Sequence, residues 1–171
     1  MNQINIQYSK TKIGDIIMGS FDGKLCLLDY RYRKMRKTVD DRIQKGLNAN
    51  YTLKDDVLLK KTKQLLEEYL EGNRKEFDIP LLMVGSEFQT CVWNALIKIP
   101  YGTTSTYLKL ANDIGNRNAV RAAARANGAN AISIIIPCHR IIGTNGELVG
   151  YGGGLAVKKR LLKLEQNYRI Q

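Results

Sequence analysis

The segment from Ile132 to Arg140, which reads Ile-Ser-Ile-Ile-Ile-Pro-Cys-His-Arg, constrains this chain more than any other. Its isoleucines predict a buried strand, because β-branched side chains fit an extended backbone that packs on both faces. Pro137 is expected to end the strand, since proline has no N–H for a ladder and fixes its own φ. The strand end then presents Cys138 beside His139, the only histidine in the sequence. This combination predicts a reactive site.

Length and composition allow either one domain or two small ones. The chain has 171 residues, of which 44% are hydrophobic and 25% charged, values that are typical of globular proteins. No stretch approaches the roughly 20 apolar residues of a membrane-spanning helix. Cys26, Cys91 and Cys138 are widely spaced, which argues against a disulfide framework and against a four-ligand zinc site. We therefore expect a cytoplasmic protein without a membrane partner, a metal or a cofactor.

The net charge of +11 indicates a polyanionic partner, although a general role in solubility would give the same charge. Residues 84–171 contain 11 lysines and arginines against 4 acids, a surplus of 7, whereas residues 1–83 contain 16 against 12, a surplus of 4. The predicted reactive cysteine and most of the excess positive charge therefore lie in the same half of the chain.

The first half of the chain predicts an antiparallel sheet followed by a helix. Apolar runs alternate with turn signals over residues 4–30, and Asp22-Gly23 is a hairpin signal between two of them. Apolar residues then recur at helical spacing over residues 55–71. We expect the basic run at residues 31–37 to be a solvated loop or strand edge, and the stretch after Gly72-Asn73, through Pro80 and Gly85, to be a linker.

The second half predicts a pair of helices that can dock on DNA. A short helix ends at Gly115-Asn116, and an alanine-rich helix follows over residues 118–126, an arrangement typical of a helix-turn-helix. Alanines cover most of the second helix apart from Arg121 and Arg125. Alanine helix propensity alone would explain this composition. Beside the basic surplus, we favour a helix that docks on DNA.

Two further helices are predicted, one on each side of this pair. The first covers residues 86–99 and opens with a capping pattern, in which Gln89 follows Ser86 by three residues. Its Trp93 is interpreted as a packing residue, with base stacking as the functional alternative. The second helix covers residues 155–167. Its basic side chains are expected to face outward: Lys158, Lys159, Arg160 and Lys163.

Cys138 is the predicted nucleophile, because a thiolate beside an imidazole or a cation is strongly reactive. Neighbouring residues of a strand point to opposite faces, so contact between the sulfur and His139 requires a bend or a bridging water. A carboxylate is needed to orient the imidazole, and we favour Glu165, on a helix, over Glu147, in a turn. The alternative for Cys138 is a small buried hydrophobic residue, and Cys91 is interpreted as an inert buried thiol of that kind.

Several ordered motifs in the second half resemble a known family. They are Phe-Gln-Thr-Cys-Val-Trp at 88–93, Ile-Pro-Tyr-Gly at 99–102, Arg-Ala at 121–122, Ile-Pro-Cys-His-Arg at 136–140 and Gly-Gly-Leu-Ala-Val-Lys at 153–158. The chain resembles the methylated-DNA–protein-cysteine methyltransferases, suicide repair proteins for 6-O-alkylguanine. The resemblance implies an α/β (α+β) fold. Residues 1–83 would form an antiparallel sheet with a helix in a ribonuclease H-like roll. Residues 84–171 would form a mostly helical, winged-helix-like domain with a helix-turn-helix, which binds DNA and accepts the alkyl group.

The resemblance implies a role for each residue of the reactive site. Cys138 would take the alkyl group from 6-O-methylguanine, and from 4-O-methylthymine as a second substrate, in an irreversible displacement that each molecule performs once. His139, oriented by Glu165, would accept the thiol proton through a water. Asn130 would hold the turn of the site. Tyr107 would crowd a phosphate, help to flip the damaged nucleotide out of the stack and protonate guanine N3 as it leaves.

The resemblance also implies how the protein, as a monomer, meets double-stranded DNA that contains an alkylated guanine. Arg121 would fill the place of the flipped base, and the helix with Ala122, Ala123 and Arg125 would lie in the minor groove. The backbone around the base pocket would read the base edge at three positions: Ile141, Tyr151 and Gly152.

The chain departs from the family pattern in three places. Ala123-Ala124 replaces Val-Gly, Ala131 replaces a proline, and Gly152 replaces a serine. The expected effects are a looser groove contact, a less rigid turn and the loss of a hydroxyl near the guanine oxygen.

Two rival functions are weighed against alkyl transfer. One is a DNA-binding module without transfer, either a winged-helix regulator or an alkyltransferase-like damage sensor; such sensors replace the reactive cysteine. The other is a cysteine hydrolase, which would need an oxyanion hole that is not evident before Cys138.

Overall fold

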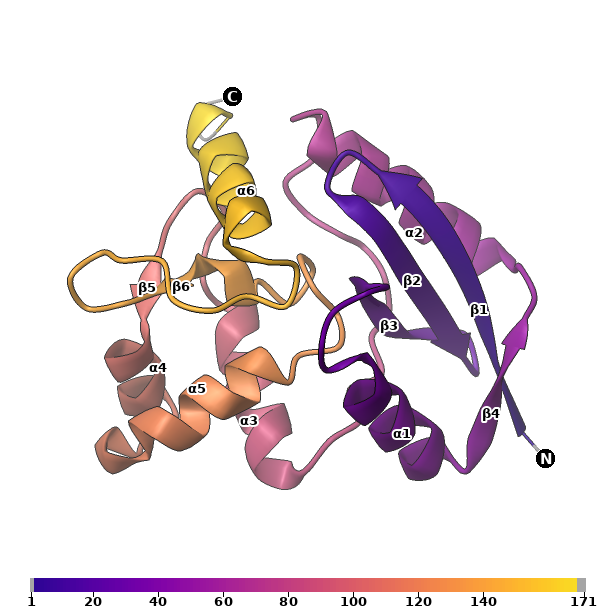
Figure 1. Ribbon diagram of the computed structural model, residues 1–171, viewed down its shortest axis with the longest axis horizontal. Helices are drawn as coiled ribbons and strands as arrows, with labels where there is room; N and C mark the ends of the chain where they lie inside the picture. The colour runs from indigo at the N-terminus through magenta and orange to yellow at the C-terminus, as the bar shows by residue number, and fades with distance from the viewer. Residues whose placement is uncertain (1, 169–171) are drawn as a thin grey trace. The chain divides into compact units, whose positions relative to one another are not determined.

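The computed structural model describes residues 2–168 and divides into two compact units, Met1–Gly85 and Ser86–Gln171. We call these the N-terminal unit and the C-terminal unit; the expected domain boundary after residue 83 lies close to this division. The mixed α/β class expected from the sequence is confirmed, with a sheet in the first unit and mainly helices in the second (Figure 1). Within the described residues, no helix is long and apolar enough to cross a membrane.

The N-terminal unit is built on a sheet with the strand order β3-β2-β1-β4. Strands β1 (Asn2–Thr11), β2 (Gly14–Phe21) and β3 (Lys24–Tyr30) pair antiparallel, as expected. A fourth strand, β4 (Ala49–Leu53), was not predicted, and it pairs parallel with β1. The reason is topological, because the chain crosses over through helix α1 (Arg36–Leu47) before it rejoins the sheet.

Local sequence signals set the turn and the second helix of this unit. Asp22 and Gly23 have φ values of 50° and 74°, as a tight hairpin turn requires. Helix α2 (Val57–Leu70) begins after Asp56, whose carboxylate accepts a hydrogen bond from the Leu59 N–H at 2.8 Å. The helix packs against β1, β2 and β3 and covers the sheet (Figure 1).

The expectation of a solvated basic run at residues 31–37 is wrong for two of its arginines. Arg33 and Arg36 turn inward and bind the buried Asp29 carboxylate, at 3.2 and 3.1 Å. Without these cations, a carboxylate buried in this way would be strongly destabilising. The run therefore divides into inward residues that stabilise the fold and outward residues, among them Tyr32.

Part of the expected linker belongs to the sheet region instead. The Leu25 N–H donates to the Pro80 carbonyl and the Leu82 N–H donates to the Leu25 carbonyl, both at 2.9 Å. These bonds satisfy backbone groups at the edge of β3 that would otherwise be exposed.

Trp93 joins two helices of the C-terminal unit. Helix α3 (Glu87–Ile97) opens with a capping box at Ser86, as predicted. Trp93 is 2% exposed, and its Nε1 donates to the Ala126 carbonyl on α5 (Val120–Gly128) at 2.8 Å. The interpretation of Trp93 as a packing residue is therefore confirmed, and the indole joins α3 to α5.

The predicted helix-turn-helix is formed by α4 (Tyr107–Asp113) and α5. Gly115, with φ of 77°, makes the turn between them. Ahead of α4, strand β5 (Ser105–Thr106) pairs parallel with β6 (Ile141–Ile142), so α4 starts beside the chain that leaves the Cys138 segment. The remaining elements are the 3₁₀ turns η1 (Arg117–Ala119) and η2 (Cys138–Arg140) and the helix α6 (Leu155–Asn167).

Candidate active site

The segment before Cys138 is a tight turn and not the predicted strand. The Ile136 N–H donates to the Ile132 carbonyl at 3.0 Å, and Ile134 has φ of 74°, a region that β-branched residues rarely enter. The Asn130 side chain accounts for the turn. It accepts a hydrogen bond from the Ile132 N–H at 3.0 Å and donates one to the Ile136 carbonyl at 2.8 Å. These bonds replace the partners that a strand would need.

The turn delivers Cys138 as the first residue of η2. Its N–H donates to the Ile136 carbonyl at 2.8 Å, and the residue is 6% exposed. Because η2 is a 3₁₀ turn, Cys138 and His139 are not held on opposite faces of a strand. The bend that contact between the sulfur and the imidazole requires is therefore present.

Glu165 is the centre of a buried polar cluster. Its Oε2 lies 2.7 Å from His139 Nε2, and its Oε1 accepts the Gly102 N–H at 3.2 Å. Arg140 donates from Nε to Oε1 at 2.8 Å and from Nη2 to Oε2 at 3.0 Å. Glu165 is 1% exposed and His139 is 0% exposed. Glu147, the other carboxylate considered, lies exposed in the loop before α6.

The electrostatics of this cluster fix the protonation of His139. Burial raises the pKa of Glu165, but hydrogen bonds from His139 and Arg140 outweigh it and hold that pKa well below its usual range. Burial lowers the pKa of His139 more than Glu165 raises it. The imidazole is therefore neutral at pH 7, and Nε2 carries the proton because the carboxylate only accepts. Nδ1 keeps its lone pair and is buried without a hydrogen-bond partner among residues 2–168, so it is available as a general base.

Tyr107 and Lys158 hold the loop before α6. The Tyr107 hydroxyl donates to the Val149 carbonyl at 2.7 Å, and Lys158 Nζ donates to the same carbonyl at 3.3 Å and to the Gly150 carbonyl at 3.2 Å. Burial raises the pKa of Tyr107 and lowers the pKa of Lys158, and the charge of Cys138 acts to raise both. Both side chains are therefore within electrostatic reach of the sulfur.

The prediction that Lys158 faces outward is wrong, since the residue is 0% exposed. Its position on α6 gives the physical reason. Lys158, Leu161 and Glu165 follow one another at helical spacing, and all three are buried on the inner face of the helix. A lysine on that face is tolerated because its ammonium group donates hydrogen bonds to the Val149 and Gly150 carbonyl oxygens.

Helix α5 presents the two predicted arginines to solvent. Arg121 and Arg125 are exposed, and Ala122 is half-buried. Ala123 is 0% exposed, so the prediction that its side chain contacts DNA is wrong. Neighbouring residues of a helix point about 100° apart, so residues two apart point to nearly opposite sides. With Arg121 facing solvent, Ala123 therefore faces the core. Ala124, where the family pattern has glycine, is half-buried.

The predicted pocket residues lie on the two segments that flank the cluster. Ile141 is 0% exposed and follows η2 directly, while Tyr151 and Gly152 are half-buried in the loop before α6. The structure thus brings His139 and Glu165 into contact in one cluster. Cys138 directly precedes His139 in the chain.

Three contributors to the site were not predicted as site residues: Gly102, Arg140 and Lys158. Arg140 adjoins His139, and a buried acid needs a cation, so its role was accessible from the sequence. Lys158 shares a helix face with Glu165, which is a second usable signal. Gly102 acts through its backbone N–H, for which the sequence holds no signal.

The other cysteines do not form part of this site. Cys26 is buried and Cys91 is exposed, which corrects the interpretation of Cys91 as a buried thiol. Across residues 2–168, no group of three or more histidine, cysteine, aspartate or glutamate side chains is placed to hold a metal ion.

Comparison with known proteins covers both units. Residues 5–83 match the model of the 6-O-methylguanine DNA methyltransferase, ribonuclease-like domain, and residues 87–167 match that of the DNA binding domain. A methylated-DNA–protein-cysteine methyltransferase of Methanosarcina acetivorans is 40% identical over 156 residues, which cover 91% of this chain and 94% of that protein. The chain belongs to the 6-O-methylguanine DNA methyltransferase family. The inducible family member of Bacillus subtilis is 46% identical over 123 residues, 72% of this chain and 69% of that protein.

Solved structures of family members have the same fold. The Mycobacterium tuberculosis protein OGT in complex with DNA superposes with a TM-score of 0.81 at 34% identity, over 96% of this chain and 94% of that one. A 6-O-methylguanine-DNA methyltransferase from Pyrococcus kodakaraensis shares the fold, with a TM-score of 0.62 at 21% identity over 95% and 98% of the two chains.

The lowered pKa of His139 predicts that the protein loses stability at acidic pH. The unfolded chain takes up a proton on this histidine at about pH 6.5, whereas the folded protein takes it up only at lower pH. The free energy of unfolding should therefore keep its full value above pH 6.5. At lower pH it should decrease, by up to about 1.4 kcal/mol per pH unit. Urea denaturation between pH 8 and pH 5.5 measures this slope.

His139→Gln is the control for that measurement, because it removes the only histidine and keeps an N–H for Glu165. The variant should lose the slope between pH 6.5 and pH 5.5. A wild-type stability that rises as the pH falls through this window would contradict the assignment.

Proposed function

We propose that this protein repairs double-stranded DNA by moving the alkyl group of 6-O-methylguanine irreversibly to its own Cys138. The observation that carries the proposal is the neutral His139, held by Glu165 and adjoining a cysteine in a family of cysteine methyltransferases. Each molecule would act once, because the product is a stable thioether. The same displacement would apply to 4-O-methylthymine.

The chemical step is an in-line displacement at the alkyl carbon. The sulfur of Cys138 forms a bond to this carbon while the bond between carbon and guanine O6 breaks, and the electron pair moves into the purine ring. The thiol proton passes through a water to His139 Nδ1, and the resulting imidazolium is stabilised by the Glu165 carboxylate. No cofactor takes part in the step.

Tyr107 is the proposed acid for the leaving guanine. Its hydroxyl would give a proton to guanine N3, so that neutral guanine leaves. The tyrosine and the imidazolium then return to their resting states by proton exchange with water. Before this step, the same side chain would crowd a phosphate and promote rotation of the damaged nucleotide. The proposal is supported by geometry, because Tyr107 opens α4 directly after β5, the strand that pairs with the chain leaving η2.

Helix α5 is the proposed DNA-docking element. Its small side chain Ala122 would allow close approach to the minor groove, Arg121 would occupy the space of the flipped base and Arg125 would contact a phosphate. Extrusion of a base costs a few kcal/mol, which these contacts would offset. The exposure of both arginines supports this assignment.

The base pocket is proposed to lie between η2 and the loop before α6. Backbone groups at Ile141, Tyr151 and Gly152 would read the edge of the base. With glycine at 152, only the backbone of this position can contribute to recognition. Transfer within one chain would make the protein a functional monomer, since Cys138 and its acid–base partners belong to the same unit. A reducing cytoplasm would keep the thiol ready.

A regulator or damage sensor that binds DNA without transfer is less well supported. A sensor has no need of a nucleophile, whereas this chain places its cysteine next to a neutral histidine with a bare Nδ1.

Alkyl transfer is tested by intact mass spectrometry after incubation with duplex DNA that carries 6-O-methylguanine. We expect one added methyl group per protein molecule, located on Cys138 by peptide mapping and lost in Cys138→Ser. Cys91→Ser is the matched control, because it removes an exposed thiol and should keep the mass gain. An unchanged mass, or a methyl group on Cys91, would refute the proposal.

The docking role of α5 is tested with two arginine variants. Arg121→Ala should slow transfer from duplex DNA by about tenfold or more at saturating DNA, because extrusion loses the side chain that replaces the base. Its effect on transfer from free benzylguanine should be far smaller. Arg125→Ala should weaken DNA binding with little change of the rate at saturation. Equal losses on duplex DNA and on benzylguanine in Arg121→Ala would rule out the extrusion role.

A further inference from the structure

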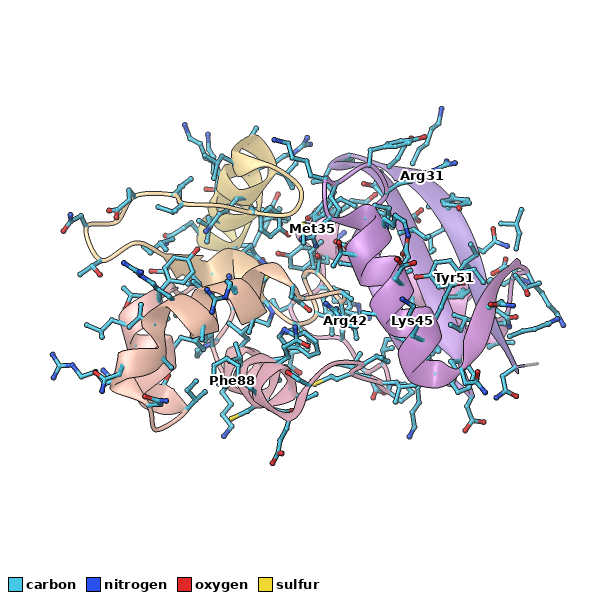
Figure 2. All side chains as sticks on the ribbon, turned by 60° about the horizontal axis from the view of Figure 1, so that its bottom comes forward. Arg31, Met35, Arg42, Lys45, Tyr51 and Phe88 are labelled. Atoms are coloured by element: carbon cyan, nitrogen blue, oxygen red, sulfur yellow. The ribbon has the colours of Figure 1, made fainter. Side chains whose placement is uncertain are left out.

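An exposed stack of two tyrosines and an arginine lies on the N-terminal unit. The Arg31 guanidinium carbon lies 3.8 Å from the ring centre of Tyr8 and 5.1 Å from that of Tyr32. Tyr8 is 41% exposed and Tyr32 is 74% exposed, both large values for aromatic side chains. Figure 2 labels Arg31, which follows directly after β3. The stack leaves a large aromatic surface open to solvent.

A lysine lies beside this stack on the sheet. Lys10 lies two residues after Tyr8 on β1, so it shares a face of the strand with Tyr8. Lys10 pairs with Asp15 in the sheet register, and the Arg31 N–H donates to the Asp15 carbonyl at 3.0 Å. Lys10 therefore lies at the same end of the sheet as Arg31.

Further basic residues extend the positive surface. Lys12 follows in the turn after β1, Lys34 follows Tyr32 in the connection to α1, and both are exposed. We call the set of Tyr8, Lys10, Lys12, Arg31, Tyr32 and Lys34 the tyrosine–arginine patch. The carboxylate of Asp29, which lies near the end of β3 just before Arg31, is bound by Arg33 and Arg36 and does not neutralise these cations.

We infer that the tyrosine–arginine patch is a docking surface for single-stranded nucleic acid. Basic side chains attract the phosphate backbone, and exposed aromatic rings and arginine planes stack on bases regardless of sequence. The bases of an intact duplex are stacked on one another, so an aromatic ring on the protein surface can stack only on an unpaired base. The exposed Tyr32 ring therefore favours a single strand as the partner over duplex DNA. The patch lies outside the unit that carries Cys138.

Fluorescence anisotropy with a labelled oligothymidylate and the full chain tests the inference. Tyr32→Ala should weaken binding by about fivefold or more, because a stacked base loses its platform. Tyr32→Phe keeps the ring and should bind like the wild type. A plot of the logarithm of the binding constant against the logarithm of salt concentration has a negative slope. Arg31→Ala should make this slope shallower by about 0.7, because one phosphate contact is lost. Lys63→Ala, which removes an exposed charge on α2, is the charge control and should have little effect.

A probe without bases separates stacking from charge attraction. An abasic strand with the same phosphates should bind more weakly than oligothymidylate and should not distinguish Tyr32→Ala from the wild type. In a strand that contains 5-bromodeoxyuridine, ultraviolet cross-links should map to peptides with Tyr8 or Tyr32. Unchanged affinity in Tyr32→Ala, or equal wild-type binding of the two probes, would overturn the inference. Methyl transfer to Cys138, followed by mass in the same variants, reports on the proposed function independently of this result.

Discussion

The buried Glu165 carboxylate is the interaction on which the reactive site depends. Its hydrogen-bond donors come from the chain before α4, through Gly102, and from η2, through His139 and Arg140. Removing one member of such a buried group typically costs about 3–5 kcal/mol, because the charge that remains is uncompensated. The carboxylate on α6 therefore ties the reactive turn to the start of the helix-turn-helix and also selects the tautomer of His139. Structure and acid–base chemistry share one set of hydrogen bonds.

Two further sets of hydrogen bonds stabilise the backbone around Cys138. The Asn130 amide bridges both ends of the turn, so the turn is fixed although Ala131 stands where the family pattern has proline. Hydrogen bonds and burial also retain Ile134 at positive φ, a conformation that costs about 1–3 kcal/mol. On the other side, Tyr107 and Lys158 donate to the Val149 carbonyl. In the proposed reaction, the Tyr107 hydroxyl must break its hydrogen bond to the Val149 carbonyl and donate to guanine instead. Lys158 can keep its hydrogen bonds to the loop during this step.

The sequence predicted elements whose local signals agree with their tertiary setting. Asp22-Gly23 specified a hairpin, Ser86 a capped helix and Gly115 the break within the helix-turn-helix, because each residue meets a backbone requirement by itself. The pairing of Glu165 with His139 could be anticipated because the chain offers few acids near its only histidine. Family resemblance added the role of Arg121, which no local pattern could supply.

The failures of prediction share a physical cause, since each depends on hydrogen bonds or packing that the properties of a single residue do not reveal. The isoleucine run satisfies strand propensity, but the Asn130 amide provides competing partners that bend it. Lys158 carries a charge that suggests solvent, yet carbonyl oxygens make burial tolerable. Ala123 belongs to a helix whose composition suggested a uniform surface, and only the packing of α5 reveals which alanine faces inward. The parallel strand β4 followed from a crossover that has no single-residue signal.

The state of the single histidine is the most direct test of this account. Nitrogen NMR of ¹⁵N-labelled protein would report only one imidazole, since the sequence contains one histidine. The predicted result at neutral pH is a proton on Nε2 and an unprotonated Nδ1, and this state should persist below the ordinary histidine pKa of about 6.5. A proton on Nδ1, or a fully protonated ring at neutral pH, would contradict the role of Glu165 as the group that prepares His139 to accept a proton from Cys138.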